Sequence, residues 1–320
     1  MDEFEIIRRH FVPATKSASV IVGVGDDGAV LRPQPGLDLV TVVDTMVAGV
    51  HFPTDLPAEH AGYRAVAVNL SDIAAMGARP RWMTLALTLN NAQTDWLKGF
   101  ANGLDSAATA HGVELVGGDT TRGTEIVISV QITGEIKAGQ AITRSGARVG
   151  DGIYVTGTIG DAALGLSKLK SPQDDVARSS GDDFLIRRFT EPDARVQVGQ
   201  DIAETATAAI DLSDGLFADL DKLLTASGVG GVIEVNEIPL SDPFRAATDT
   251  DERLRHVLAG GDDYELCFTA PSDAFENESR IAGVPVTRIG QVTDERQLTC
   301  TRAGKNIHYH DTGYRHFDES

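Results

Sequence analysis

The stretch YRAVAVNLSDIAAMGARPRWMTLALTL (residues 63–89) joins two periodicities in one short segment. Residues 63–78 are mostly small and apolar, and Gly77 and Pro80 end the run, which predicts a closely packed helix. The residues that follow, RWMTLALTL (81–89), predict a strand. A helix that leads directly into a strand favours a layered α/β architecture.

The same alternation continues on both sides of this stretch. Strands are expected at 37–45, 113–123 and 125–136, and an amphipathic helix at 94–112. A glycine-rich segment, RSGARVGDG (144–152), follows, and IYVTGTIGDAALGLSKL (153–169) then begins a new strand, turn and helix. We therefore expect two domains, residues 1–140 and 141–320.

The composition excludes several classes of partner. The chain has 320 residues, a net charge of −19 and a pI of about 4.7, so it should repel nucleic acid and anionic membrane surfaces. Its two cysteines, Cys267 and Cys300, lie in β-like stretches and suit buried thiols better than a disulfide framework. No stretch has the length of a membrane span, and the first residues lack an apolar signal core, so we expect a cytoplasmic protein.

Carboxylates recur where the expected strands end or where glycines allow a turn. Side chains at strand ends point into the crevice in which α/β proteins bind ligands. Asp72 differs, because it lies inside an apolar helix, where an unpaired carboxylate would be costly. It needs a cation or a hydrogen-bond donor, although a salt bridge or a helix-end partner would also serve. The acids of this pattern are Asp26, Asp27, Asp44, Asp72, Asp119, Asp211, Asp214, Asp262 and Asp263.

The segment GVGDDGAV (23–30) raises the question of whether these carboxylates bind a metal ion. Taken alone it is a solvated turn, since Asp and Gly both favour turns. The chain has no GxxxxGK[ST] phosphate loop, and its Cys and His residues form no metal motif. Convergent carboxylates without such ligands favour Mg²⁺, which binds phosphates together with one or two carboxylates. Arg122 and Arg144 are the cations best placed to touch a phosphate, and each could equally be a surface residue.

Eight motifs in order resemble a known family over nearly the whole chain. Together they are similar to the thiamine-monophosphate kinases, which belong to the aminoimidazole ribonucleotide synthetase superfamily. Any one of them is a weak signal, whereas all eight in this order are specific. The motifs are GVGDDGAV (23–30), VDTMVAGVHF (43–52), AVNLSDIAAMGARP (67–80), LVGGDTTRG (115–123), ITRSGARVGD (142–151), YVTGTIGDAALGL (154–166), AIDLSDGLFADL (209–220) and GGDDYELCF (260–268).

The resemblance implies an activity, a fold and a site. The activity is the ATP-dependent phosphorylation of thiamine monophosphate to thiamine diphosphate, with several Mg²⁺ ions. The fold has an N-terminal ATP- and metal-binding α/β domain, whose sheet pairs across a homodimer, and a C-terminal α/β domain. The implied metal ligands are Asp27, Val43, Asp44, Asp72, Asp119, Asp211 and Asp214. The implied ATP contacts are Gly118, Asp119, Arg144 and Ser213, and those to thiamine phosphate are His51, Asp262 and Tyr314.

Two positions depart from the family pattern. Many members carry Ser or Thr before the aspartate of VDT, where this chain has Val42 and Val43, so only a backbone carbonyl of Val43 could bind metal. Members often have Glu at Asp262, and the shorter acid keeps the charge with less reach. Asp26 suits a turn-forming role beside Asp27.

Other functions stay open at this stage. A selenophosphate synthetase would need a reactive residue near its N-terminus, but no cysteine precedes Cys267. A hydrogenase-maturation carbamoyl dehydratase would end in a Cys-bearing tail, whereas this sequence ends RHFDES. The remaining alternatives are an aminoimidazole ribonucleotide synthetase-like enzyme and a nucleotide-binding module without catalysis.

Overall fold

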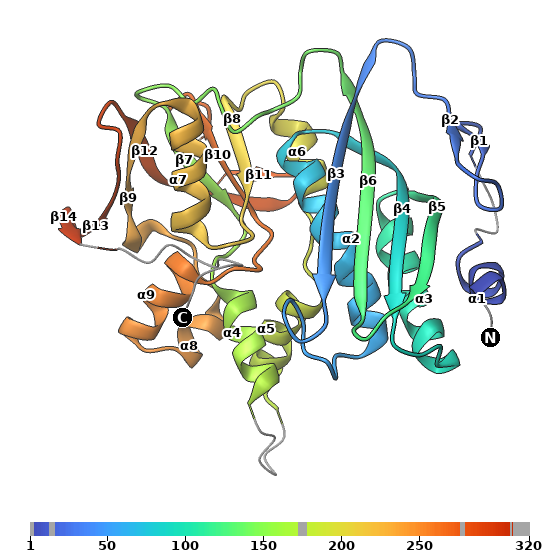
Figure 1. Cartoon of the computed structure of the whole chain (residues 1–320). Coiled ribbons are helices and arrows are strands. Elements are labelled where there is room, and N and C mark those ends of the chain that lie inside the picture. The colour runs from blue at the N-terminus through green and yellow to red at the C-terminus, as the bar shows by residue number, and fades with distance from the viewer. Residues whose placement is uncertain (1–2, 13–16, 172–177, 276–278, 308, 310–320) are drawn as a thin grey trace. The chain divides into compact units, whose positions relative to one another are not determined.

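The structure is a computed structural model that describes residues 3–12, 17–171, 178–275, 279–307 and 309 (Figure 1). The chain forms two compact units. Unit 1 consists of Met1–Ile73 and Ala78–Ala141, and unit 2 of Ala74–Gly77 and Ile142–Ser320. Each unit combines a sheet with helices, which agrees with the expected α/β class.

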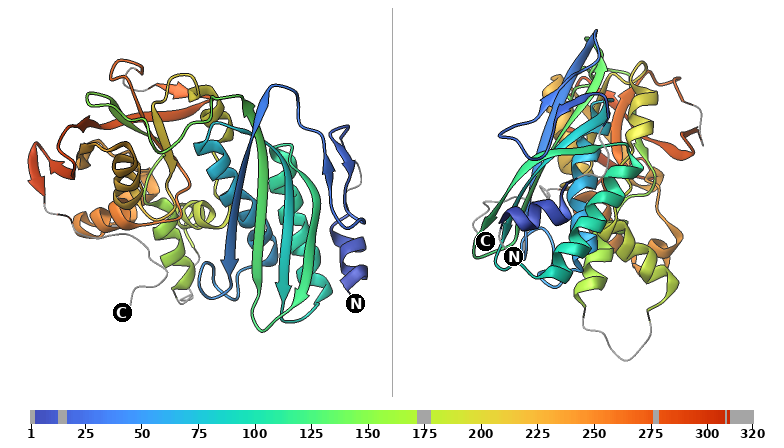
Figure 2. Two further views of the ribbon diagram at one scale, coloured as in Figure 1. Left: turned by 45° about the horizontal axis from the view of Figure 1, so that its top comes forward. Right: turned by 90° about the vertical axis from the view of Figure 1, so that its right-hand side faces the viewer.

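Unit 1 is built on a four-stranded sheet in the order β3-β6-β4-β5. The pairs β3·β6 and β6·β4 are antiparallel and β4·β5 is parallel. The helices α2 and α3 lie on one face of this sheet, and no helix among the described residues covers the other (Figure 2). The elements of unit 1 are α1 (Glu3–His10), β1 (Val20–Val22), β2 (Val30–Leu31), β3 (Leu37–Val47), α2 (Ala58–Ala75), β4 (Arg79–Leu89), α3 (Thr94–Ala110), β5 (Glu114–Arg122) and β6 (Val127–Lys137).

The helices α2 and α3 touch backbone to backbone at two glycines. A Cβ atom on Gly62 would lie 2.1 Å from the carbonyl oxygen of Phe100, and one on Gly103 would lie 1.8 Å from that of Glu59. Only glycine permits so close an approach. This crossing confirms the closely packed helix expected around residues 63–78 and gives α2 a fixed position against the sheet.

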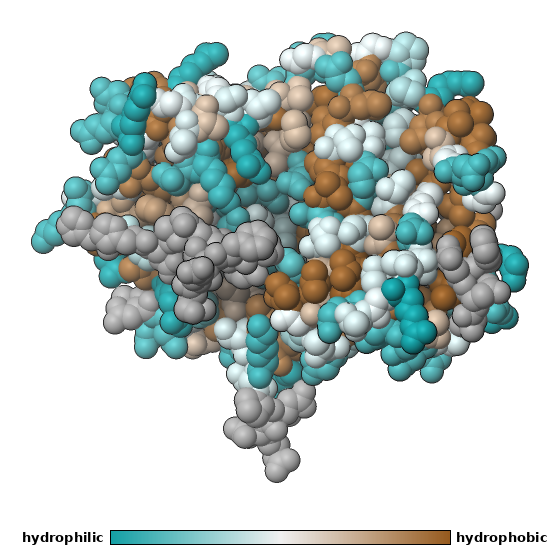
Figure 3. Space-filling view, in the orientation of Figure 1, coloured by the Kyte–Doolittle hydropathy of each residue, from teal (hydrophilic) through white to brown (hydrophobic). Residues whose placement is uncertain are grey.

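Side chains alternate along β3 between the two faces of the sheet. Val40 and Met46 are buried on the side of the helices, whereas Leu39 and Val43 on the bare side are 51% and 65% exposed. Thr45 on the same bare face exchanges a hydrogen bond of 2.7 Å with Ser129 of β6. The bare face therefore mixes exposed aliphatic side chains with hydroxyl groups, and Figure 3 shows brown and pale side chains across it.

Unit 2 is built on an eight-stranded sheet. Its strands follow the order β14-β13-β9-β12-β7-β10-β8, and β11 pairs with β12 outside this path. The elements are β7 (Gly152–Thr156), α4 (Asp161–Lys170), α5 (Ser180–Thr190), α6 (Val196–Ile202), β8 (Ala208–Asp211), α7 (Leu216–Ser227), β9 (Gly230–Glu234), the 3-10 helix η1 (Val235–Glu237), α8 (Asp242–Ala247), α9 (Thr250–Ala259), β10 (Leu266–Ala270), β11 (Arg280–Ile281), β12 (Val284–Thr293), β13 (Leu298–Arg302) and β14 (Lys305–Ile307).

The core of unit 2 lies between α7 and the sheet. Helix α7 contacts β8, β9 and β13, and its leucines 216, 220, 223 and 224 are all buried. The central strands β7 and β10 are buried along their whole length, as expected of strands covered on both faces. Cys267 in β10 and Cys300 in β13 are free and buried, which confirms the expected thiols.

One expected strand end is wrong. Asp44 does not end its strand, because β3 continues to Val47 and pairs with β6 along its full length. The strand expected at 113–123 is confirmed as β5, and Asp119 lies inside it. Among the described residues, no helix is long and apolar enough to cross a membrane.

Candidate functional site

A hydrogen bond joins Asp44 of β3 to Asn69 of α2, the helix that also carries Asp72. The side chain of Asn69 in α2 accepts a hydrogen bond of 3.0 Å from the backbone N–H of Asp44, and itself donates to the carbonyl of Ala65. Asp72 follows Asn69 by three residues and so lies on the same side of α2. It is half-buried between the buried Ser71 and Ile73. The backbone of Asp44 is thus tied to the helix that carries Asp72 three residues after Asn69.

The GVGDDGAV loop connects β1 to β2 in unit 1. The carboxylate of Asp26 accepts a hydrogen bond of 2.9 Å from the backbone N–H of Asp27, which fits the turn-forming role expected of Asp26. Gly25 has a φ of 113°, a conformation that glycine adopts readily. The side chain of Asp27 is exposed. The turn therefore presents Asp27 to solvent while Asp26 is used within the loop.

His51 lies in the loop that follows β3. Its Nδ1 accepts a hydrogen bond of 3.0 Å from the backbone N–H of Val47. An imidazole that accepts at Nδ1 is neutral and carries its proton on Nε2. The loop therefore orients a neutral ring whose Nε2–H group is a donor, as a phosphate oxygen requires.

Gly118 and Asp119 lie on the opposite edge of the same sheet from Asp44. Strands β3 and β5 are separated by β6 and β4, so their backbones are about 14 Å apart at roughly 4.8 Å per strand. The register also places Asp119 beside Ala86, Ser129 and Thr45 on the bare face, whereas Asp44 pairs with the buried Val130. Within one chain, these two carboxylates cannot share a metal ion, because each oxygen ligand lies only about 2.1 Å from Mg²⁺.

In unit 2, the loop of residues 212–215 connects β8 to the N-terminus of α7. The buried carboxylate of Asp219 accepts hydrogen bonds of 2.9 Å from the backbone N–H groups of both Ser213 and Asp214. Lys222 binds the carboxylates of Asp214 at 2.6 Å and Asp219 at 2.8 Å. Burial raises the pKa of Asp219, and the ammonium of Lys222 opposes that rise. The positive charge of Lys222 thus compensates the negative charges of Asp214 and Asp219. Asp219 of α7 also fixes the backbone of the loop through its two hydrogen bonds.

Asp262 is fixed against this loop. Its backbone N–H donates to the carbonyl of Ser213 at 2.9 Å, and the N–H of Tyr264 donates to Leu212 at 2.9 Å. A Cβ atom on Gly261 would lie 2.4 Å from the same Ser213 carbonyl oxygen, so the contact depends on glycine. The structure therefore brings Ser213, Asp214 and Asp262 together.

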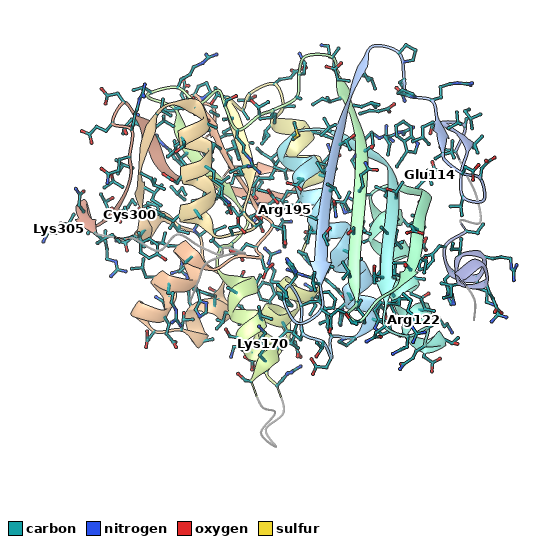
Figure 4. The ribbon with its side chains drawn as sticks, in the orientation of Figure 1. Glu114, Arg122, Lys170, Arg195, Cys300 and Lys305 are labelled. Atoms are coloured by element: carbon teal, nitrogen blue, oxygen red, sulfur yellow. The ribbon has the colours of Figure 1, made fainter. Side chains whose placement is uncertain are left out.

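Arg144 does not join this group. Its carbonyl accepts a hydrogen bond of 3.0 Å from the hydroxyl of Ser227, the last residue of α7, whereas Ser213 and Asp214 precede the first. The 12 residues of α7 span about 18 Å, so a ligand that touched both ends would have to run along the helix. Arg122 is an exposed residue at the end of β5 in unit 1 (Figure 4).

A buried ion network in unit 2 was not anticipated from the sequence. Glu265 accepts hydrogen bonds from Arg188 at 2.7 Å, from Arg195 at 2.6 and 2.7 Å, and from Thr156 at 2.6 Å. Burial opposes ionisation of Glu265, but Arg195 and Arg188 outweigh it and hold its pKa below the ordinary value. Figure 4 shows Arg195 within unit 2. The available signal was an acid inside the apolar run YELCFTA, the same signal that singled out Asp72.

The remaining site residues stay predictions. Val43 is exposed on the bare face of β3, Asp211 is the buried last residue of β8, and Tyr314 lies outside the described residues. Within the described part of the chain, no group of three or more His, Cys, Asp or Glu side chains is close enough to hold a metal ion. The predicted ligands are divided, with Asp27, Val43, Asp44, Asp72 and Asp119 in unit 1 and Asp211 and Asp214 in unit 2.

Comparison with known proteins decides the family. Residues 25–136 match the AIR synthase related protein, N-terminal domain, and residues 148–302 match its C-terminal domain. The thiamine-monophosphate kinase of Salmonella typhimurium is 43% identical over 98% of both chains, and that of Escherichia coli K12 is 42% identical over the same share. The chain belongs to the thiamine-monophosphate kinase family.

Solved structures of thiamine-monophosphate kinases agree with this assignment. The kinase of Stenotrophomonas maltophilia K279a is 39% identical, with a TM-score of 0.81 over 91% of this chain and 93% of that one. A complex of AaThiL with AMPPCP and TMP is 31% identical, with a TM-score of 0.80 over 92% of each chain. The hydrogenase maturation protein HypE, at 21% identity and a TM-score of 0.72, shares the fold. The expected two-domain architecture of the superfamily is therefore confirmed.

Proposed function

We propose that this protein phosphorylates thiamine monophosphate with ATP to give thiamine diphosphate. The observation that carries the proposal is the identity of 43% with a thiamine-monophosphate kinase over 98% of both chains. The AaThiL relative has been solved with AMPPCP and TMP bound together, which fits a reaction between a nucleotide and TMP.

The chemistry needs positioning more than a general base. The acceptor is itself a phosphate, whose second pKa near 6 makes it largely a dianion at neutral pH. It can therefore attack the γ-phosphorus of ATP without losing a proton to a side chain. The obstacle is repulsion between two polyanions, and catalysis must bring them together in line. We accordingly propose direct transfer and assign no catalytic base.

The aspartates fit Mg²⁺ by their donor chemistry. They offer only carboxylate oxygens, which hard cations prefer, and the hydrogen bond from Asp44 to Asn69 ties Asp44 to the helix of Asp72. When bound, Mg²⁺ would neutralise phosphate charge and hold the reacting oxygens in line. We propose Asp27, the carbonyl of Val43, Asp44, Asp72, Asp119, Asp211 and Asp214 as its ligands, which assigns metal and ATP binding mainly to the N-terminal domain.

The substrate contacts follow from the same loops. The Nε2–H group of His51 would donate to the acceptor phosphate. Asp262, held against Ser213, would contact thiamine phosphate beside the nucleotide contact of Ser213. Gly118, Asp119 and Arg144 are the further proposed contacts to ATP, and Tyr314 the further proposed contact to thiamine phosphate.

A homodimer with paired sheets is the assembly that the family resemblance implies. Asp44 and Asp119 lie on opposite edges and opposite faces of one sheet, so one chain does not bring both to one metal ion. The bare face of the sheet, with exposed Leu39 and Val43, suits such pairing. We propose that this face forms the dimer interface and that each subunit contributes to its partner's site.

One assay tests the reaction against the alternatives. ADP release from Mg-ATP is measured with thiamine phosphate, with thiamine, with aminoimidazole precursors and without acceptor. The proposal requires release that depends on thiamine phosphate, with thiamine diphosphate as the product. Release with an aminoimidazole precursor would favour the related synthetase, and nucleotide binding without release would favour a non-catalytic module. With a chiral γ-phosphoryl group, retention at phosphorus would contradict a single in-line step.

A further inference from the structure

Unit 2 contains a pocket that shares no residue with the proposed catalytic site. It has a volume of about 190 Å³ and is lined by η1, the segment after it, α8, α9 and β13. Pockets for drug-sized ligands measure roughly 300–1,000 Å³, so this one suits a smaller molecule. Its walls consist of three arginines, Asn236 and a set of aliphatic side chains.

The three arginines are Arg245 of α8, Arg253 of α9 and Arg302 of β13. They come from separate elements, yet they line one small cavity in a chain with 28 basic and 47 acidic residues. Among the described residues, neither Arg245 nor Arg302 has an ion pair. Positive charges around one small cavity repel one another unless an anion lies among them.

Three acids adjoin lining residues in sequence: Glu234, Glu237 and Glu252. Glu237 and Glu252 are exposed, and among the described residues neither forms an ion pair with a pocket arginine. Glu234 precedes the lining residue Val235, but its carboxylate accepts hydrogen bonds from Thr301, Ala303 and Gly304 at 3.0 to 3.1 Å. These bonds hold the β13–β14 turn and leave Glu234 committed to it. Among the described residues Glu234 forms no direct ion pair with Arg302, although the two lie on adjacent strands.

Arg253 is held in a fixed orientation. Its Nη2 donates to the carbonyls of Arg245 at 3.1 Å and Thr248 at 3.0 Å, at the C-terminal end of α8. Thr248 is buried, and its hydroxyl in turn donates to the carbonyl of Phe244 at 2.7 Å. No described residue accepts a hydrogen bond from the Nη1 group of Arg253. A guanidinium fixed in this way loses little entropy when it binds an oxyanion.

The other wall of the pocket is apolar. Leu254 and Val257 of α9 lie one turn apart and face Ile238, Leu240 and Val235. Inorganic phosphate alone would leave this surface in contact with water, whereas a ligand with a small apolar group would cover it. We propose that the pocket binds a small phosphate monoester, with its dianionic phosphate among the three arginines and its carbon skeleton against the aliphatic wall.

Calorimetric titration of the full chain tests the site, with EDTA present so that the proposed metal site does not hold phosphates. The probe is phenyl phosphate, and the wild type should bind one equivalent per chain, at least threefold more tightly than inorganic phosphate. Benzoate, with a single charge, should bind at least fivefold more weakly than phenyl phosphate. Binding of benzoate as tight as that of phenyl phosphate would overturn the assignment to a phosphate monoester.

Substitutions locate the binding. Arg245→Gln, Arg302→Gln and the double variant should each weaken phenyl phosphate binding, the double variant at least tenfold. Arg255→Gln is the matched control, because Arg255 lies on α9, is exposed and does not line the pocket. Its affinity should stay within twofold of the wild type. The exposed Arg245 can be replaced without disturbing the fold, so its single variant remains decisive if the double variant is unstable.

Two results would refute the site. One is the absence of phenyl phosphate binding to the wild type. The other is equal affinity in the wild type and in Arg245→Gln, which would place the bound ligand elsewhere in the chain. Kinase activity of Arg245→Gln serves as the folding control and should equal that of the wild type, since the proposed reaction does not use Arg245.

Discussion

The carboxylate of Asp263 accepts a hydrogen bond of 2.6 Å from the backbone N–H of Gly160. It accepts a second, of 3.2 Å, from the N–H of Ala162, and so caps the first turn of α4 from within the core. Burial raises the pKa of Asp263 to about 8 despite these bonds. Asp161 raises it further, and Arg188 opposes the rise. The residue next to the proposed substrate contact Asp262 is thus a carboxyl group that holds its proton near neutral pH.

This pKa predicts a pH dependence of stability. The folded state binds the Asp263 proton more tightly than the unfolded state, whose pKa lies near 3.8. The contribution of Asp263 to stability is therefore full below pH 4 and is lost as the pH rises toward about 8. Asp263→Asn cannot titrate, so the variant should gain stability relative to the wild type between pH 5 and pH 8. Urea denaturation at both pH values measures this, and a pH-independent difference would contradict it.

Glu265→Gln should destabilise unit 2 strongly. The substitution leaves Arg188 and Arg195 buried without their carboxylate, and breaking one partner of a buried pair costs about 3–5 kcal/mol. Asp193→Asn is the matched control, because Asp193 also binds Arg195 but its side chain is 67% exposed. It should cost less than about 1 kcal/mol. Urea denaturation compares the two, and equal losses would refute the distinction.

Gly118→Ala and Gly117→Ala form a matched pair in the LVGGDTTRG motif. A Cβ atom on Gly118 would lie 2.0 Å from the carbonyl oxygen of Leu85 in β4, whereas one on Gly117 would meet nothing within 4 Å. Gly118→Ala must push β5 away from β4 and should cost about 1–3 kcal/mol. It should also raise the KM for ATP, because Asp119 moves with the strand. Gly117→Ala should change both quantities little, and a similar effect of both would exclude the steric explanation.

Removal of the proposed metal ligands should affect turnover rather than folding. Asp27→Asn, Asp72→Asn and Asp214→Asn should each lower kcat by about 10²-fold or more and raise the Mg²⁺ concentration needed for half-maximal activity. Asp26→Asn is the control, because its amide oxygen can still accept the hydrogen bond from Asp27. It should remain close to the wild type. Wild-type activity in any of the first three variants would remove that residue from the ligand set.

The sequence predicted which segments form helices and strands better than it predicted which strands lie side by side in a sheet. The helix around Asp72 and the strands expected at 81–89, 113–123 and 125–136 formed where their periodicities indicated, because apolar spacing is a local property. The order of strands in a sheet is not local. The motifs VDTMVAGVHF and LVGGDTTRG do not indicate that Asp44 and Asp119 lie on opposite edges of one sheet. That arrangement results from the pairing of β3 with β6 and of β5 with β4.

The buried network around Glu265 was missed for a related reason. Its partners Arg188 and Arg195 lie on α5 and just before α6, about 70 residues away in sequence. An isolated acid in an apolar run shows that some partner exists, but the fold decides which. Helix α9 was also missed, because TDERLRHVLA carries too few apolar residues to show a helical stripe.

The two buried thiols allow the local unfolding of unit 2 to be measured. Burial raises the pKa of Cys300 to about 12 and that of Cys267 still further, so the reactive thiolate is scarce while unit 2 is folded. Alkylating reagents and mild oxidants should therefore leave the native enzyme untouched, and the two sulfurs should react together once β10 and β13 separate from the sheet. The rate of thiol labelling would then measure how often unit 2 opens, without any added probe.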